Sequence, residues 1–460
     1  MTLRFEQILA DGVAECSYLL GDDATHTCAV VDPRPDVEIY LETARRFGMA
    51  ITHVFETHIH ADFLSGAREL VDRLDGQAKL CVSTEGGADY GFAHEQVRDG
   101  DEFTFGGMRM KARFTPGHTP EHMSYLLFDG DTETPWGVLS GDAFFVDSVG
   151  RPDLLGDDQS EELAEKLFHT VQDVFMALPD DVIIYPCHGA GSACGPDIGD
   201  RMSSTIGYER RFNSYARIDD LEKFKKAILG DAPPVPTHYP RMKKVNSKGP
   251  KVLRNLPRIE PMTVERFSEA GAQLLDVRDM MDFGTGHVPG SLNIGARPEL
   301  SVWAGWLLDP EKPIHLVLHD DGDLLGVLRL LWRTGFTDFG GYLAGGMAAW
   351  REAGREFAQI PQISVHELSG AEDLQPLDVR KPDEWEGGHV PGARHAFLGE
   401  LRDEIDNLDR AAPYATYCAS GFRASIAASL LKKNGFDQVR NVPGSWKAWQ
   451  AAGYEIEKPN

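Results

Sequence analysis

An α/β protein of several domains is expected from this sequence, for two reasons. In the first 232 residues, strand-like apolar runs lead into loops, and helical patterns follow them. In roughly the last 200 residues one pattern occurs twice: Leu275–Arg278 (LDVR) returns as Leu377–Arg380, and Gly286–Gly290 (GHVPG) returns as Gly388–Gly392. Such a repetition indicates a duplicated fold. The 460 residues leave room for roughly three domains.

Charge and composition exclude several partners. The chain has 46 Lys and Arg against 72 Asp and Glu, a net charge of −26, so no basic surface for nucleic acid is expected. No apolar run approaches the ~18 residues of a membrane span, and the first residues lack the pattern of a signal peptide. We therefore expect a cytoplasmic protein that binds neither nucleic acid nor membrane. Whether the chain forms a homo-oligomer stays open.

The first domain, residues 1–232, is expected to begin with strands and to end with helices that cover them. Ile51–Thr57 alternates apolar and polar residues as a strand does. Residues 158–178 form a helical pattern with Leu163 and Leu167 on one face, and Asp158 with Glu161 is spaced as a capping box at its start.

A linker is predicted next, over residues 233–258. Four prolines within Pro233–Pro240 break helix and strand alike, and a basic stretch follows them. The two repeats are then residues 259–358 and 359–460. In each, short apolar runs such as Ile314–Leu318 and Tyr414–Tyr417 alternate with helical patterns, which predicts a mainly parallel sheet.

Four loops of the first domain carry side chains that bind metals. Each follows an apolar run and places His or Asp beside Gly or Pro. Such a set suits a metal held at the ends of several strands. The residues are His58, His60, Asp62, His118, Asp142 and His188.

This pattern resembles the metallo-β-lactamase superfamily, whose fold is an αββα sandwich with metal between the sheet ends. The two-metal hydrolases of that superfamily carry His after the Asp of the His-x-His-x-Asp loop, whereas this chain has Phe63. The pattern is more similar to the persulfide dioxygenase branch. That resemblance implies one Fe(II) per chain, bound by His58, His118 and Asp142, with positions open for O₂ and a substrate sulfur.

The same resemblance suggests roles for other residues of this domain. Arg151 and Asp153, in a Gly-Arg-x-Asp motif, would bind a polar or anionic substrate group, unless they form a purely structural pair. His60, Asp62 and His188 would hydrogen-bond the ligands or bound water. Cys194 lies in a Gly- and Ser-rich loop, where it is either a thiol that relays sulfur or an unreactive loop cysteine.

The last repeat contains a cysteine in a setting that favours chemistry. Cys418 follows a strand-like run and opens a Cys-x-x-Gly-x-Arg loop before a helical run, so backbone N–H groups and the helix terminus would favour its thiolate. This repeat resembles the rhodanese sulfurtransferases along its whole length. The resemblance implies that Cys418 is the nucleophile that carries sulfur and that Arg423 contacts a sulfite or thiosulfate anion. His389 is interpreted as part of a structural turn.

The first repeat resembles the same family but lacks its cysteine, because none occurs between residues 195 and 417. Its matching loop is Asp320–Asp323, whose carboxylates would repel an anionic sulfur species. We therefore expect a structural or docking module that does not transfer sulfur.

Together these features predict a persulfide dioxygenase joined to a sulfurtransferase, an arrangement suited to sulfide detoxification. Its small-molecule partners would be a low-molecular-weight thiol persulfide, O₂, and sulfite or thiosulfate. Which thiol carries the persulfide and the direction of sulfur flow stay open. Two alternatives remain: a thioester hydrolase of the glyoxalase II type with two zinc ions, and a non-catalytic sulfur-relay or sensing protein.

Overall fold

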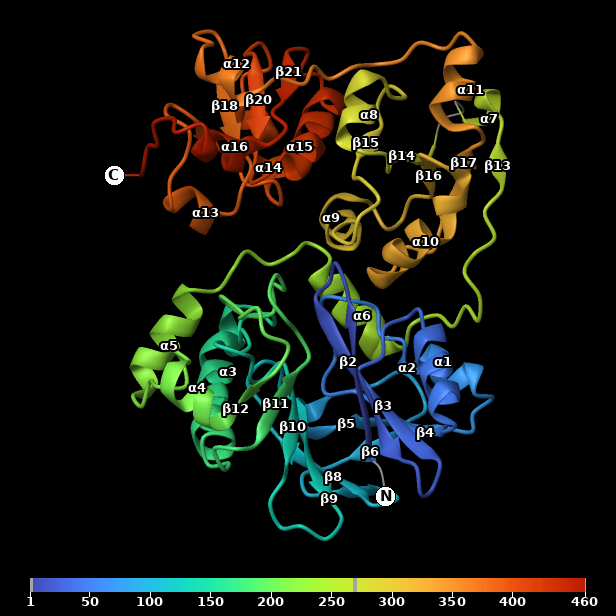
Figure 1. Cartoon of the computed structure of the whole chain (residues 1–460), viewed down its shortest axis with the longest axis vertical. Helices are drawn as coiled ribbons and strands as arrows, with labels where there is room; N and C mark the ends of the chain where they lie inside the picture. Colours follow the sequence, from blue (N-terminus) through green and yellow to red (C-terminus); the bar gives the residue numbers. More distant parts are fainter. Residues whose placement is uncertain (1–2, 268–270, 460) are drawn as a thin grey trace. The chain divides into compact units, whose positions relative to one another are not determined.

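The computed structural model describes residues 3–267 and 271–459 and divides into two compact units. The first contains Met1–Asn255 together with Trp332–Gly335, and the second contains Leu256–Leu331 and Phe336–Asn460. Figure 1 shows the elements of each unit along the chain.

Two six-stranded sheets form the centre of the first unit. In the first sheet the strands run in sequence order from β1 to β6, antiparallel through β3 and parallel from there on. The second sheet has the order β12-β11-β10-β9-β8-β7, and only β10 and β11 pair in parallel. The strands are β1 Leu3–Ala10, β2 Glu15–Asp22, β3 Thr27–Val31, β4 Ala50–Phe55, β5 Lys79–Ser83, β6 Glu95–Val97, β7 Glu102–Phe105, β8 Met108–Phe114, β9 Met123–Asp129, β10 Gly137–Gly141, β11 Ile183–Pro186 and β12 Ser204–Thr205.

Helices cover the outer face of each sheet, so the unit has four layers. Tyr18, Phe55 and Tyr125 belong to a buried core drawn from both sheets. A second core joins the first sheet to α1 and α2, and a third joins the second sheet to α3 and α5. The helices are α1 Glu38–Phe47, α2 Ala67–Arg73, η1 Glu85–Gly87, α3 Asp157–His169, η2 Thr170–Phe175, α4 Ile206–Phe212 and α5 Leu221–Gly230. The expected αββα sandwich is confirmed.

The long helix expected over residues 158–178 differs in two respects. Regular α-helix ends at His169 and a π-helical turn, η2, follows it, although the apolar face continues through buried Val171 and Phe175. The predicted capping box is wrong, because Gly156 is the N-cap residue and no side chain caps the helix. Apolar spacing alone does not distinguish these two helix types.

The predicted linker is wrong over its central part. Residues Tyr239–Lys248 form helix α6, and the first compact unit continues to Asn255. Pro240 lies in the first turn of α6, where a helix needs no N–H from it. The side-chain amide of Asn246 donates to the carbonyls of His60 and Phe63, and its oxygen accepts from the Ser65 N–H.

The second unit contains two parallel sheets, as the repeat pattern predicts. Their strand orders are β13-β17-β16-β14-β15 and β19-β18-β20-β21, and every pairing is parallel. The strands are β13 Pro261–Met262, β14 Gln273–Asp276, β15 Leu292–Asn293, β16 Ile314–Val317, β17 Phe339–Leu343, β18 Gln375–Asp378, β19 Arg394–His395, β20 Tyr414–Tyr417 and β21 Val439–Asn441. The helices are α7 Val264–Phe267, α8 Met280–Thr285, α9 Leu300–Leu307, η3 Asp321–Asp323, α10 Leu324–Arg333, α11 Gly346–Glu352, α12 Val365–Ser369, α13 Pro382–Glu386, α14 Leu401–Glu404, η4 Ile405–Asn407, α15 Phe422–Lys433 and α16 Ser445–Ala451.

The two repeats share one hydrophobic core within this unit. Trp306 of the first repeat packs edge-on against Phe397 of the second, with ring centroids 5.7 Å apart. Ser425 and Ser429 of α15 hydrogen-bond to Asn293 of β15. The repeats therefore support each other's packing. Among the described helices, none is long and apolar enough to cross a membrane.

The anchoring of α6 can be tested with Asn246→Ala. The change leaves the carbonyls of His60 and Phe63 without their side-chain donor in a buried setting, which should lower the free energy of unfolding by about 2 kcal/mol. Denaturant unfolding measures the difference. Lys244→Ala, at an exposed position of the same helix, is the control and should stay within about 0.5 kcal/mol of wild type. Equal stability of the two variants would contradict the anchoring.

Candidate functional site

Three of the predicted site residues converge on one buried point in the first unit. His58 follows β4, His118 follows β8 and Asp142 follows β10, and their ligand atoms all lie within 4.8 Å of one another. Asp142 Oδ2 is 3.7 Å from His58 Nε2 and 3.4 Å from His118 Nε2. Within the described part of the chain, His58 Nε2 and Asp142 Oδ2 are buried and have no hydrogen-bond partner. Two buried ligand atoms without a hydrogen-bond partner, one of them on the carboxylate itself, fit a bound cation.

The two histidines are held in an orientation that suits metal binding. His118 Nδ1 is 2.9 Å from the Arg151 carbonyl, and His58 Nδ1 is 2.9 Å from Thr57 Oγ1. These contacts leave both Nε2 atoms facing Asp142. Burial lowers the pKa of both rings well below the usual value, so both are neutral, the form that binds metals.

His188 connects Asp142 to Asp62. Its Nδ1 is 2.7 Å from Asp142 Oδ1, and its Nε2 is 2.7 Å from Asp62 Oδ2. Both ring nitrogens must donate to carboxylates, so the ring is an imidazolium. Burial alone would lower its pKa, but the two carboxylates raise it well above the usual value. The protonated ring thus bridges the two aspartates, and Asp62 and His188 also form, with Cys194, a group that could hold a metal ion.

His60 lies beside the site, but it contacts two carboxylates instead of the ligands that the sequence analysis expects it to hydrogen-bond. Its Nε2 is 3.0 Å from Asp32 Oδ1 and 2.9 Å from Glu56 Oε2. Asp32 also accepts from the N–H and hydroxyl of Thr57, and the ring of Phe63 packs on His60 with centroids 4.5 Å apart. The sequence analysis did not select Asp32 or Glu56, although both follow strand-like runs and Glu56 lies two residues before His58.

Arg151 and Asp153 form the two-point pair that the sequence suggests. Arg151 Nε and Nη2 each lie 2.7 Å from a different Asp153 carboxylate oxygen, and Nη1 donates to the Ala193 carbonyl. The guanidinium is buried and its donors are engaged. Arg151 acts on the site through its backbone carbonyl, which orients His118.

Cys194 lies in the loop between β11 and β12, as the sequence suggests. Its thiol is buried, lies 3.7 Å from the Tyr239 hydroxyl and faces Asp62 and His188 with ligand atoms within 4.8 Å. Burial and the nearby carboxylates raise its pKa well above the usual value. The thiol is therefore protonated, which argues against a freely accessible relay.

Cys418 lies in the second unit at the end of β20, as the motif suggests. The Gly421 N–H donates to its sulfur at 3.1 Å, and the Cys418 N–H donates to Ser445 Oγ at 3.1 Å. Gly421 has a φ of 112°, and a Cβ there would lie 3.1 Å from the Pro443 Cα. Glycine at this position allows the loop to close on the sulfur before α15 begins.

Arg423 has a partner that the sequence did not indicate. Its Nη1 and Nη2 lie 2.6 and 2.8 Å from the two carboxylate oxygens of Glu384. Burial disfavours its charge, but Glu384 and then Cys418 raise its pKa above the usual value. The guanidinium therefore stays charged near the thiol, and a carboxylate largely balances that charge.

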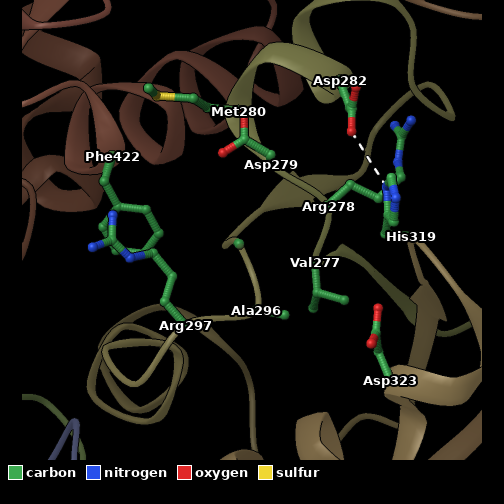
Figure 2. A pocket seen from close by; sticks show the side chains of 11 residues that line it. Val277, Arg278, Asp279, Met280, Asp282, Ala296, Arg297, His319, Asp323 and Phe422 are labelled. Carbon is green, nitrogen blue, oxygen red and sulfur yellow. Dashed lines mark ion pairs between the residues drawn. The ribbon is translucent and has the colours of Figure 1, made fainter.

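The first repeat contains a cavity of about 350 Å³ beside its DVR motif. Figure 2 shows the carboxylates of Asp279, Asp282 and Asp323 around it, with Asp282 paired to His319 at 3.4 Å. Phe422, from the helix that follows the Cys418 loop, also lines this cavity. Of the Asp320–Asp323 loop only Asp323 lines this cavity, and Arg278 and Arg297 line it as well.

Comparison with known proteins identifies each part of the chain. The model of the metallo-β-lactamase superfamily matches residues 13–188, and the rhodanese-like domain model matches residues 262–353 and 363–452. The chain is 31% identical over 222 residues to the persulfide dioxygenase ETHE1 of Homo sapiens, covering 47% of this chain and 76% of that protein. The chain belongs to the metallo-β-lactamase superfamily. Two rhodanese-like domains follow its metallo-β-lactamase domain.

Other relatives extend this comparison. A crystal structure of a metallo-β-lactamase from Staphylococcus aureus is similar at a TM-score of 0.68 and 32% identity, over 74% of this chain and 99% of that chain. A hydroxyacylglutathione hydrolase of Gloeobacter violaceus is 37% identical over 121 residues, covering 25% of this chain and 47% of that protein. The metallo-β-lactamase fold implies a metal cofactor, and the three buried ligand atoms around Asp142 fit one.

The assignment of these ligands can be tested with His118→Ala. Removing the imidazole should weaken metal binding by more than the ~10- to 100-fold loss of affinity that is typical when a metal ligand loses only its hydrogen-bond partner. Elemental analysis after dialysis against a chelator measures the metal retained. His169→Ala changes an exposed histidine on α3 and should retain the wild-type content. Equal retention by both variants would show that His118 is not a ligand.

Proposed function

We propose that this chain is a persulfide dioxygenase with a sulfurtransferase attached. The metallo-β-lactamase domain would oxidise a low-molecular-weight thiol persulfide with O₂ and water to sulfite, the free thiol and two protons. The buried set of His58, His118 and Asp142, with two orphaned ligand atoms, carries this proposal. Homology to persulfide dioxygenases supports it.

One iron ion is the cofactor that this site suits best. Two neutral histidines and one carboxylate are the ligands of Fe(II) oxygenases, and iron bound there would supply the redox chemistry that O₂ requires. The chain's own residues fix the ligands: the Arg151 carbonyl orients His118, and His188 holds Asp142. The phenyl ring of Phe63 offers no lone pair at the position where the two-metal hydrolases carry His, which argues against a second metal and so against the two-zinc hydrolase.

The second step of the proposal belongs to Cys418. Its thiolate would attack the outer sulfur of a persulfide, releasing the thiol and forming a cysteine persulfide. Sulfite would then take that outer sulfur, giving thiosulfate and regenerating the thiolate. The Gly421 N–H stabilises negative charge on the sulfur, and Arg423 supplies a cation nearby. The first rhodanese-like domain has no cysteine and would take no part in transfer.

Metal analysis tests the first step. Protein purified without oxygen should contain one iron per chain and should consume O₂ when given a thiol persulfide, because His58, His118 and Asp142 together supply the ligands for one ion. Elemental analysis and an oxygen electrode measure both. Two zinc ions per chain with hydrolysis of an acyl thioester would instead favour the glyoxalase II alternative, and full iron loading without O₂ consumption would favour a sensing role.

Product analysis of Cys418→Ser tests the second step. The variant should consume O₂ as the wild type does and release sulfite, while its rate of thiosulfate formation falls roughly 10³-fold or more because the nucleophile is gone. Chromatography of the two anions under O₂ gives the ratio. Ser420→Ala alters an exposed residue of the same loop and should keep the wild-type ratio. A normal ratio in Cys418→Ser would contradict forward transfer.

A further inference from the structure

Helix α6 places one side chain toward the metal centre that neither the sequence motifs nor the comparisons assign. Tyr239, Lys243 and Asn246 are spaced i, i+4 and i+7, so they share one face of the helix. Tyr239 contacts the Cys194 thiol, and Asn246 binds the loop that carries His58 and His60. Lys243, between them, therefore faces the same group of loops.

The ammonium of Lys243 is buried without a partner. Its Nζ has no hydrogen bond within residues 3–267 and 271–459, and burial lowers its pKa. Lys243 lies within electrostatic range of His118, one of the predicted ligands, and of Glu121. Glu121 is engaged elsewhere, because its Oε1 accepts the Ile59 N–H at 2.9 Å.

A buried ammonium without a hydrogen-bond acceptor is unfavourable unless a ligand supplies the missing acceptor. The ligand must be anionic to balance the charge, and small enough to lie beside the metal ligands. The substrate of the proposed function meets both requirements, because the outer sulfur of a persulfide is an anion at neutral pH. Many low-molecular-weight thiols also bear a carboxylate.

We infer that Lys243 is a substrate-binding residue whose ammonium pairs with an anionic group of the thiol persulfide beside the His58, His118 and Asp142 centre. This inference rests on the proposed dioxygenase function and adds to it a requirement for negative charge on the substrate. It also gives α6 a role beyond packing.

The test uses the full chain loaded with iron and compares Lys243→Met, which keeps an unbranched side chain one atom shorter and removes its charge, with wild type. Two substrates separate the possible anions: glutathione persulfide, which bears carboxylates, and the persulfide of 2-mercaptoethanol, which bears none. The KM of Lys243→Met should rise about tenfold or more, as expected for the loss of a charge-assisted hydrogen bond, with kcat changed much less. Lys243→Arg should recover part of the loss.

The pattern across the two substrates identifies the anion. A rise in KM with both substrates identifies the persulfide sulfur as the anion that pairs with Lys243. A rise in KM with glutathione persulfide alone identifies a carboxylate as that anion. Both outcomes support the inference. An unchanged KM with both overturns it. Lys244→Met, on the exposed side of α6, should match wild type, and equal iron content and thermal unfolding of the variants exclude misfolding as the cause. Wild-type protein that turns over neither persulfide would instead refute the proposed function itself.

Discussion

The fully buried carboxylate of Asp142 is the constraint around which the first unit is arranged. A buried carboxylate is tolerated only if cations or hydrogen-bond donors surround it. One oxygen binds the imidazolium of His188, and the other faces the Nε2 atoms of His58 and His118 without a partner of its own. The Asp142 N–H donates to His122 Nε2, which fixes the loop from a further side. Bound metal would supply the charge that these neighbours leave uncompensated.

The repeated motifs of the second unit have a structural cause that is independent of sulfur chemistry. In the first repeat Arg278 binds both oxygens of Asp276 and the Gly286 carbonyl, and in the second Arg380 binds Asp378 and the Gly388 carbonyl in the same manner. His389 stacks on Trp385, as His287 stacks on Phe283. These contacts join a strand to the turn after it, so a copy without the cysteine still needs them. This supports the interpretation of His389 as structural.

Much of the fold was predictable because it follows from local patterns. The duplicated motifs predicted the two parallel sheets, and the four loops with His and Asp indicated where strands of the first domain end. The predictions of the linker and of the long helix were wrong, because the effect of a residue depends on its position within an element. A proline inside a helix usually ends it, whereas Pro240 lies in the first turn of α6. Apolar spacing did not distinguish the π-helical turn after His169 from regular α-helix. The resemblance to the persulfide dioxygenase branch selected His58, His118 and Asp142, whereas Asp32, Glu56, Glu384 and Lys243 belong to no motif and are found only through tertiary contacts.

The charge balance at Cys418 differs from that at the metal centre, and the difference fits the function proposed for each site. At Cys418 the guanidinium of Arg423 is balanced by Glu384, and the direct contact to sulfur comes from the neutral Gly421 N–H. A site that carries an anionic sulfur and then releases it benefits from donors without excess positive charge, since strong charge pairing would slow transfer. In the proposed function the metal centre would instead hold a small anion while O₂ reacts with it, for which the buried ammonium of Lys243 would be suited. Under this proposal, one class of anion would bind a hydrogen-bonding loop at one site and a buried charge at the other.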